Sequence, residues 1–354
     1  MQRLKVAVLG AGGLVAQRLQ QRLSSHPWFS LEAVAGSPRF EGMAFADVPW
    51  TLDEDRPAFP SMQVLDVLSH ETPKRLRSSG VRVAFSALPS EQAIDIEPRW
   101  AEAGIVVFSN ASAYRGATGI PLVVPEINGK ELANTGGGPL LHACATNCTL
   151  LPLALPLAAL NEAFGLIAFT MRSEQGLSGG GHAYMQEAIA DGRVDPDIPG
   201  EAEKTGQEFE TVLDWTGSRI IDCARVMRKD GHQVFVTATF ERPFDPEEAR
   251  HALERWSDNN RFNNLPSSPH QPLMLVDCVD AGVHLFADGK GYPGNPNPAV
   301  DLDAGMAIVV GNLESPEPMV LQFQALSHNT IRGAAGGLIF LAELALHMNL
   351  IEPN

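Results

Sequence analysis

The feature that most constrains this fold is a strand, a glycine loop and a helix at the start of the chain. The apolar run LKVAVLG (4–10) predicts a buried strand, and the helical pattern LVAQRLQQRL follows it. Small residues in such a loop let the backbone approach a pyrophosphate, and the helix N-terminus offers amide hydrogens and a positive dipole. We therefore predict dinucleotide binding, although the same loop is compatible with a structural turn. The expected contacts are Gly10, Gly12, Gly13, Leu14 and Val15.

The second predicted strand indicates which dinucleotide binds. LEAVAG (31–36) is followed by Ser37 and Arg39, and no acidic residue occurs before Glu41. NAD-binding proteins usually have an acid there for the ribose hydroxyls, whereas a hydroxyl and a guanidinium suit a 2′-phosphate. The sequence therefore favours NADP; the alternative is an exposed turn with an ordinary surface arginine. A further strand ends in FSALPS (85–90), and the contacts expected on the nicotinamide side are Ser86, Leu88 and Pro89.

The order of strand and helix patterns predicts two domains. Strands alternate with helices up to about residue 141, which indicates an α/β, doubly wound, Rossmann-type domain with a parallel sheet. From residue 142 onward, turn-separated strand patterns such as LIAFTMRSE and VHLFADG predict a mixed or antiparallel sheet in an α+β domain. The final helical stretch is expected to pack back on the first domain. The predicted division is 1–141 with 329–354 for cofactor binding, and 142–328 for catalysis and dimerisation.

Composition excludes several classes of partner. The 354 residues carry a formal net charge of −16, so we expect no binding to nucleic acid or to an anionic membrane surface. An anionic ligand therefore requires a local cationic pocket. The first residues run directly into a strand, so no secretory signal is expected, and no apolar run is long enough to span a membrane. The four cysteines lack metal-site spacing, which predicts no metal site, reduced thiols and a cytoplasmic protein.

Cys148 is the first candidate for chemistry. It stands in ATNCTLLPL, directly before a long apolar helical pattern. If Thr146 or Asn147 caps that helix, Cys148 lies in the first turn, where unpaired amides lower a thiol pKa and favour the thiolate. The Cys148 amide and the Asn147 side chain would then bind an oxyanion formed by attack on a carbonyl. The alternative is a buried, inert cysteine, since cysteine is among the most buried residue types.

Two further segments supply candidate partners for the sulfur. The stretch 223–240 predicts a hairpin around Asp230–Gly231, which would project Arg225 and His232 to the same side. A cation for a carboxylate and an imidazole for proton transfer would then serve one substrate. Gln175 ends a strand before a glycine-rich loop that can wrap an anion through its amides. The alternatives are an inert turn histidine at His232, or His182 as the base.

The motifs, taken in order, resemble those of the aspartate-semialdehyde dehydrogenase family of archaeal and fungal type. VLGAGGLVAQRL, SNASAYRG and PLVVPEIN resemble its opening and its loop after the fifth strand. TNCT resembles its nucleophile motif, QGLSGGG and RVMRKDGH resemble its two other catalytic segments, and ALSHNTIRGAAGG resembles its C-terminal signature. The resemblance spans nearly the whole chain.

The resemblance implies a role for each candidate residue. Cys148 would be the nucleophile and His232 the general acid/base, while Gln175 and Arg225 would hold the carbonyl region and the carboxylate of the substrate. It also implies NADP-dependent, phosphorylating aldehyde dehydrogenase chemistry in lysine, threonine and methionine biosynthesis, in a homodimer or homotetramer. Its substrates would be an acyl phosphate and phosphate. The remaining sites it implies are Asn147, Arg115 and Lys204 for phosphate, and Ser178, Gly179 and Asn329 for the cofactor.

One departure from the family pattern leaves alternatives open. Ala202 stands where the family pattern leads us to expect an acid for the substrate amino group, and Glu201 or Glu203 would have to replace it. One alternative is therefore a related acyl reductase, such as a malonyl-CoA reductase, that keeps Cys148 and His232. The other is a catalytically silent NADP-binding paralogue, against which the intact catalytic candidates argue.

Overall fold

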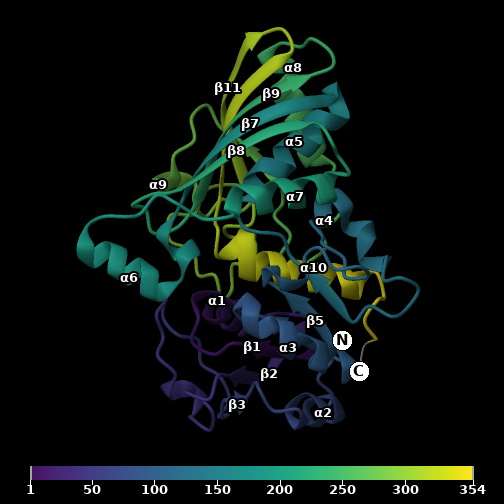
Figure 1. The fold of residues 1–354 in the computed structure, drawn as a ribbon, viewed down its shortest axis with the longest axis vertical. Helices are drawn as coiled ribbons and strands as arrows, with labels where there is room; N and C mark the ends of the chain where they lie inside the picture. Colours follow the sequence, from purple (N-terminus) through teal and green to yellow (C-terminus); the bar gives the residue numbers. More distant parts are fainter. Residues whose placement is uncertain (1, 353–354) are drawn as a thin grey trace.

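The computed structural model describes residues 2–352 and contains two six-stranded sheets (Figure 1). The N-terminal sheet lies at the bottom of Figure 1 and the second sheet at the top. The ends of the two segments predicted for the cofactor domain, Met1 and residues 353–354, lie outside the described range.

The first sheet is parallel throughout, as the alternation of strands and helices predicts. Its order is β3-β2-β1-β4-β5-β6. Successive strands are therefore added on one side of β1 up to β3 and on the other side from β4 onward, so the strand order reverses between β1 and β4. Ligands of such sheets bind at this reversal, beyond the carboxyl ends of the strands. The sixth strand extends to Cys144, three residues beyond the division predicted after residue 141. The strands are β1 (Leu4–Leu9), β2 (Phe29–Gly36), β3 (Leu65–Asp66), β4 (Val83–Ser86), β5 (Val106–Ser109) and β6 (His142–Cys144).

Helices cover both faces of the first sheet. Helix α1 (Leu14–Leu23) and helix α10 (Gly336–His347) pack together on one face, and their apolar side chains form one core with β1 and β2. Helices α2 (Glu71–Ser78) and α3 (Ser90–Glu102) pack on the other face. The last helix therefore returns to the first sheet, and Figure 1 shows it (yellow) at the level where the two halves of the molecule meet.

The second sheet is mixed, in the order β10-β11-β12-β9-β7-β8. Three helices pack against one face of it: α5 (Leu150–Phe164), α7 (Glu201–Leu213) and α8 (Pro246–Asp258). Helix α8 begins with a capping box at Asp245, and Pro246 occupies its first position. The strands are β7 (Leu166–Gln175), β8 (Ser218–Arg225), β9 (His232–Phe240), β10 (Leu273–Leu275), β11 (Ile308–Glu317) and β12 (Val320–Ser327).

Two local predictions for this sheet are wrong. The segment 223–240 is not a hairpin, because β7 lies between β8 and β9 and pairs with both. The stretch VHLFADG is not a strand; the helix α9 (Ala281–His284) occupies its start. Asp280 explains the second difference, because its side chain accepts a hydrogen bond from Gly282 N at 2.7 Å and so caps a helical turn.

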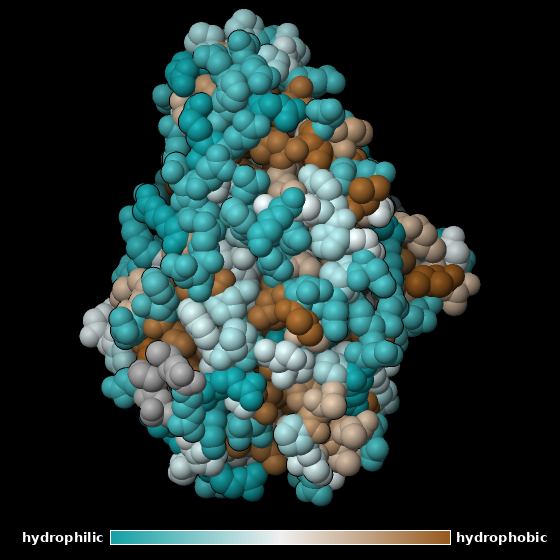
Figure 2. Space-filling view, turned by 180° about the vertical axis from the view of Figure 1, so that it is seen from behind, coloured by the Kyte–Doolittle hydropathy of each residue, from teal (hydrophilic) through white to brown (hydrophobic). Residues whose placement is uncertain are grey.

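One face of the molecule is largely polar. Figure 2 shows a mainly hydrophilic face on which hydrophobic side chains form separate small groups. Among residues 2–352, no helix combines the length and apolar character needed to cross a bilayer.

A buried polar contact fixes α10 to the first domain. Glu343 is fully buried in this apolar helix and accepts hydrogen bonds from His26 Nε2 (2.8 Å) and Ser267 N (3.0 Å). Burial lowers the pKa of the nearby Arg22 to about 10, and the Glu343 carboxylate acts in the opposite direction. The carboxylate therefore compensates buried donors from two distant parts of the chain.

We expect Glu343→Leu to lower the free energy of unfolding by about 3–5 kcal/mol, because it leaves buried polar partners uncompensated. Urea denaturation measures this loss. Glu71→Ala serves as the control, since the Glu71–Lys74 ion pair is exposed and contributes little. Equal losses in the two variants would contradict the assigned role of Glu343.

Candidate active site

Cys148 lies at the junction between β6 and α5, in a turn that the Asn147 side chain closes. The Asn147 Oδ1 atom accepts hydrogen bonds from Thr149 N (3.0 Å) and Leu150 N (2.9 Å). Helix α5 begins at Leu150 with Thr149 at its N-cap position, so Cys148 lies in the turn directly before the helix, and the prediction that places it in the first helical turn is wrong. Because of these bonds, the Asn147 side-chain oxygen and the Thr149 and Leu150 amides are hydrogen-bonded to one another within the turn.

The Cys148 sulfur is protonated in the free protein. Burial raises the pKa of the Cys148 thiol to about 12, and the Glu201 carboxylate raises it further, while Arg115, Arg225 and the residue's own amide act in the opposite direction. The residue nevertheless keeps partial exposure. The expectation of a thiolate at neutral pH is therefore wrong for this state, because desolvation outweighs the helix terminus and both arginines.

A row of three side chains crosses the second sheet. Gln175 at the end of β7 pairs in register with Arg225 on β8 and with His232 on β9. Residues directly opposite in adjacent strands project to the same face, so the three side chains lie side by side. All three are buried. Arg225 and His232 therefore share a face as predicted, but with Gln175 between them rather than across a hairpin.

His232 is a neutral imidazole with a defined tautomer. Burial lowers its pKa to about 3, and the neighbouring Arg225 contributes in the same direction. Gly176 N donates to Nδ1 at 3.2 Å, so the ring carries its proton on Nε2. Within residues 2–352, this buried Nε2 has no hydrogen-bond partner. It is thus a proton donor available to an oxygen of a bound ligand.

Gly179 leaves room beside this donor. A Cβ at position 179 would lie 3.2 Å from His232 Nε2 and 2.6 Å from Arg225 Nη1. The glycine loop that follows Gln175 therefore passes close to both groups without a side chain between them. The rival base, His182, begins the helix α6 (His182–Asp191) and is partly exposed.

One face of α7 lines the other side of the cysteine turn. Glu201 Oε1 accepts from Thr149 Oγ1 (3.2 Å), Thr205 Oγ1 accepts from Asn147 Nδ2 (3.3 Å), and Glu208 Oε2 accepts from Asn147 N (2.6 Å). Thr205 and Glu208 are buried site residues that the sequence predictions miss. The signal for them is their spacing of four and seven residues from Glu201, which places all three on one helix face.

The predicted phosphate ligands differ in their surroundings. Arg115 Nη1 donates to Glu208 Oε1 (2.8 Å) and Nη2 donates to Asn110 O (2.8 Å), which ties Arg115 to the α7 face. Lys204 is exposed on α7, on the same side of the helix as Glu201 and Glu208. Glu203 is also exposed and accepts a hydrogen bond from Gln207 at 2.8 Å, so of the two glutamates only Glu201 contacts the cysteine turn in the described structure.

The glycine loop fits a dinucleotide at the strand reversal. Gly10 has φ +111°, and a Cβ there would lie 3.2 Å from Ala87 O, so the position requires glycine. Ser86, at the end of β4, has a buried hydroxyl that lacks a partner in the described part of the chain. Leu88 is buried and Pro89 precedes α3. The predicted contacts therefore meet at one edge of the sheet.

The predicted adenosine contacts and Asn329 lie on different segments of the chain. Ser37 and Arg39 follow β2, and the Arg39 guanidinium lies over the Phe40 ring at 5.3 Å. The Asn329 side chain binds two loops of the second half of the molecule: its Nδ2 donates to Ser178 Oγ (2.8 Å) and its Oδ1 accepts from Gly231 N (2.8 Å). Asn329 thus joins the glycine loop, the β8–β9 connection and the C-terminal segment.

The residues of the first glycine loop pack against both halves of the molecule. Leu14 belongs to a small core with Leu177 and Met185, which joins the first glycine loop to the second domain. Val15 packs against the main core of the first domain. A Cβ at Gly12 would lie 3.0 Å from the Phe40 ring, which connects the loop to the turn that carries Arg39.

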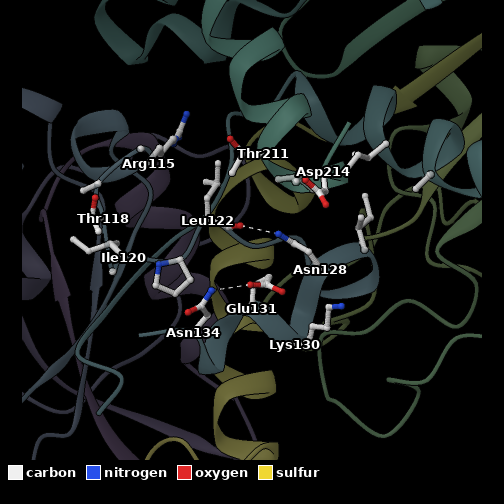
Figure 3. Close-up of a pocket in the computed structure, with 18 of the residues that line it drawn as sticks. Arg115, Thr118, Ile120, Leu122, Asn128, Lys130, Glu131, Asn134, Thr211 and Asp214 are labelled. Atoms are coloured by element: carbon white, nitrogen blue, oxygen red, sulfur yellow. Dashed lines mark hydrogen bonds between the residues drawn. The ribbon is translucent and has the colours of Figure 1, made fainter. Parts of the chain in front are cut away.

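A cavity of about 850 Å³ lies beyond Arg115. Arg115 and Thr118 lie on one side of it, and Thr211 and Asp214 on another (Figure 3). Of the predicted site residues, Arg115 alone lines this cavity within the described structure. The cavity is therefore separate from the row that contains His232.

We predict that the rate of Cys148 alkylation by iodoacetamide rises about tenfold per pH unit from pH 7 to pH 9 without a plateau, because only the thiolate reacts and the pKa lies far above. Peptide mass spectrometry measures the rate at Cys148 alone. Glu201→Gln should raise the rate at each pH, since the Glu201 carboxylate raises the thiol pKa. Glu203→Gln is the matched control and should have no effect; a plateau below pH 8 would contradict the protonated thiol.

Comparison with known proteins places this arrangement in a family. Residues 5–135 match the model of the semialdehyde dehydrogenase NAD-binding domain. An aspartate-semialdehyde dehydrogenase of Archaeoglobus fulgidus is 34% identical over 99% of this chain and 100% of its own length. One of Aspergillus fumigatus is 31% identical over 97% of both chains. The crystal structure of aspartate-semialdehyde dehydrogenase with NADP from Candida albicans has a TM-score of 0.78 at 28% identity, covering 99% of this chain and 100% of that one.

These matches include both halves of the molecule. They extend from the glycine loop through the cysteine turn to the last helix, so the likeness is not confined to a shared cofactor domain. The archaeal and fungal sources agree with the type that the motifs resemble. The chain belongs to the aspartate-semialdehyde dehydrogenase family.

Proposed function

We propose that this enzyme reduces aspartyl-4-phosphate to aspartate semialdehyde, with release of phosphate, through a thioester on Cys148. The observation that carries the proposal is the set of charges around one thiol: Glu201, Arg115 and Arg225 all act on Cys148. A zwitterionic substrate with a phosphoryl group needs such a mixture of charges. The family relationship supports the same activity.

The proton balance follows from the neutral state of the free site. The Cys148 sulfur attacks the acyl carbon, the bond to the phosphoryl oxygen breaks, and the thiol proton leaves with the phosphate. His232 carries its proton on Nε2 and donates a hydrogen bond from it to the carbonyl oxygen as negative charge develops there. Because His232 carries no charge before the reaction, it stabilises the oxyanion by hydrogen bonding rather than as an imidazolium.

Each end of the substrate has a proposed partner. Arg225 binds the carboxylate, and Gln175 orients the carbonyl region from the same row. Glu201 binds the amino group, since it contacts the cysteine turn while Glu203 does not. Arg115 and Lys204 bind the phosphate, and Asn147 holds the turn that presents the sulfur. Glu201 thus supplies the acid that is missing at Ala202, which favours an amino-acid substrate over malonyl-CoA.

We further propose NADP as the cofactor, held by the glycine loop, by Ser86, Leu88 and Pro89, and by Ser178, Gly179 and Asn329. The requirement for glycine at Gly10 and the unpartnered Ser86 hydroxyl, as far as the described residues show, support a ligand at this edge. When bound, NADPH supplies the hydride that reduces the thioester. Ser37 and Arg39 bind the 2′-phosphate, and the related Candida albicans enzyme was solved with NADP.

The proposed assembly is a homodimer or homotetramer, acting in the cytoplasm in lysine, threonine and methionine biosynthesis. Three helices cover one face of the second sheet, whereas the opposite face carries exposed side chains. Ile220 on β8 is 67% exposed, and Arg172 lies over the Phe235 ring at 4.3 Å. A second copy packed on this face would bury both.

We expect the wild-type protein to form NADPH from aspartate semialdehyde, phosphate and NADP, and Cys148→Ala to abolish this activity because it removes the nucleophile. Absorbance of NADPH follows the reaction. Cys278→Ala, which removes an exposed cysteine, is the matched control and should retain activity. Oxidation of NADPH with malonyl-CoA, together with no NADPH formation from aspartate semialdehyde and phosphate, would instead support the related acyl reductase. No activity in either assay would support a silent paralogue.

Arg39→Ala should raise the KM for NADP by about 10- to 100-fold, because it removes a charge-assisted contact with the 2′-phosphate. The KM for NAD should change little, since NAD lacks that phosphate. Steady-state kinetics with each cofactor measure the two effects, and Lys74→Ala controls for loss of a surface charge. Equal losses for NADP and NAD would show that Arg39 does not recognise the 2′-phosphate.

A further inference from the structure

The backbone of Gly333 packs directly against Cys148. A Cβ at position 333 would lie 2.5 Å from Cys148 Cβ and 3.0 Å from Cys148 Cα. Real Cβ atoms do not approach so closely, so any side chain here would displace the cysteine. The position of Cys148 therefore depends on the position of the segment around Gly333, although the two lie 185 residues apart in the sequence.

That segment is a single π-helical turn, Ile331–Ala335, directly before α10. Two hydrogen bonds of the wide, five-residue type hold it: Gly333 N donates to His328 O (3.1 Å) and Ala335 N donates to Thr330 O (3.1 Å). A π turn inside a helix is rare and is frequent at functional sites. Its wide geometry sets where the Gly333 backbone meets Cys148, so the turn needs an anchor.

Arg332 provides that anchor. Its Nη2 atom donates to both carboxylate oxygens of Glu126, at 2.8 and 2.7 Å. Both side chains are almost completely buried, with 1% and 4% exposure. The Arg332 guanidinium also lies over the Phe340 ring of α10 at 5.4 Å.

Glu126 is itself held in place by its own short helix, α4 (Pro125–Asn128). The Asn128 side chain closes this turn, because Oδ1 accepts from Val124 N (2.8 Å) and Nδ2 donates to Leu122 O (2.9 Å). The carboxylate therefore presents a fixed site to Arg332. One buried ion pair thus connects α4 to the π turn, and the π turn contacts the cysteine.

We propose that Glu126 and Arg332 form a positioning pair that sets the place of the Cys148 sulfur through Gly333. The inference rests on the proposed role of Cys148 as nucleophile. Neither side chain touches the reacting atoms. The pair holds the π turn, and with it the Gly333 backbone that packs against Cys148.

A purely stabilising role explains this pair poorly. Buried ion pairs often contribute no more stability than apolar side chains of similar volume, because both charges lose their water. An ion pair does restrict the relative orientation of its two side chains, since a carboxylate and a guanidinium bind each other in a narrow range of geometries. A nucleophile needs that accuracy, because a displacement of about 1 Å can reduce a rate by about 100-fold.

The test replaces the pair with apolar side chains in the full-length protein. Glu126→Leu combined with Arg332→Met removes both charges and leaves neither unpaired. We expect a folded protein in which kcat and the rate of Cys148 alkylation by iodoacetamide both fall by about 10- to 100-fold, while the KM for aspartate semialdehyde stays nearly unchanged. Gly333→Ala is an independent second variant that displaces Cys148 directly, and we expect the same pattern from it.

Glu343→Gln is the matched control, because it removes a buried charge of α10 away from the site. It should lower the melting temperature and leave Cys148 alkylation unchanged. Wild-type kcat and alkylation in the folded double variant would overturn the proposal; if that variant does not fold, wild-type alkylation in Gly333→Ala would overturn it. Alkylation needs no substrate, so the outcome is independent of whether aspartyl phosphate is the acyl donor.

Discussion

The turn that the Asn147 side chain closes is the local constraint on which the rest of the site depends. The Asn147 side-chain oxygen accepts a hydrogen bond from Leu150 N at the start of α5. Its side-chain nitrogen donates to Thr205 Oγ1, and its backbone nitrogen donates to Glu208 Oε2. One residue therefore connects the start of the helix under the second sheet to the polar face of α7. Cys148 follows immediately, so its backbone is held by the hydrogen bonds of Asn147 while its side chain packs against the Gly333 backbone.

Desolvation decides the electrostatic state of this site. The Cys148 thiol and the His232 ring are both neutral, because burial disfavours the charged form of each. The fixed charges are Glu201, Arg115 and Arg225, which match the charges of the proposed substrate rather than ionise the nucleophile. In a protein with a net charge of −16, Arg115 and Arg225 give this site the local positive charge that an anionic substrate requires.

Local patterns in the sequence predict much of this molecule, but pairings between distant segments do not appear in them. The glycine loop, the parallel sheet, the mixed sheet and the position of Cys148 directly before a helix all follow from periodicity and capping residues. The row of Gln175, Arg225 and His232 does not, because β7 enters between two strands that are adjacent in the sequence. The protonated thiol and the contact with Gly333 likewise depend on burial by segments far along the chain.

The central claim is that Cys148 carries the acyl group between loss of phosphate and reduction. The most direct measurement incubates the enzyme with aspartyl phosphate in the absence of NADPH and combines a phosphate assay with peptide mass spectrometry. The account predicts one phosphate released per protomer and an aspartyl group on the Cys148 peptide. Phosphate release without an adduct at Cys148, or an adduct on another residue, would contradict it.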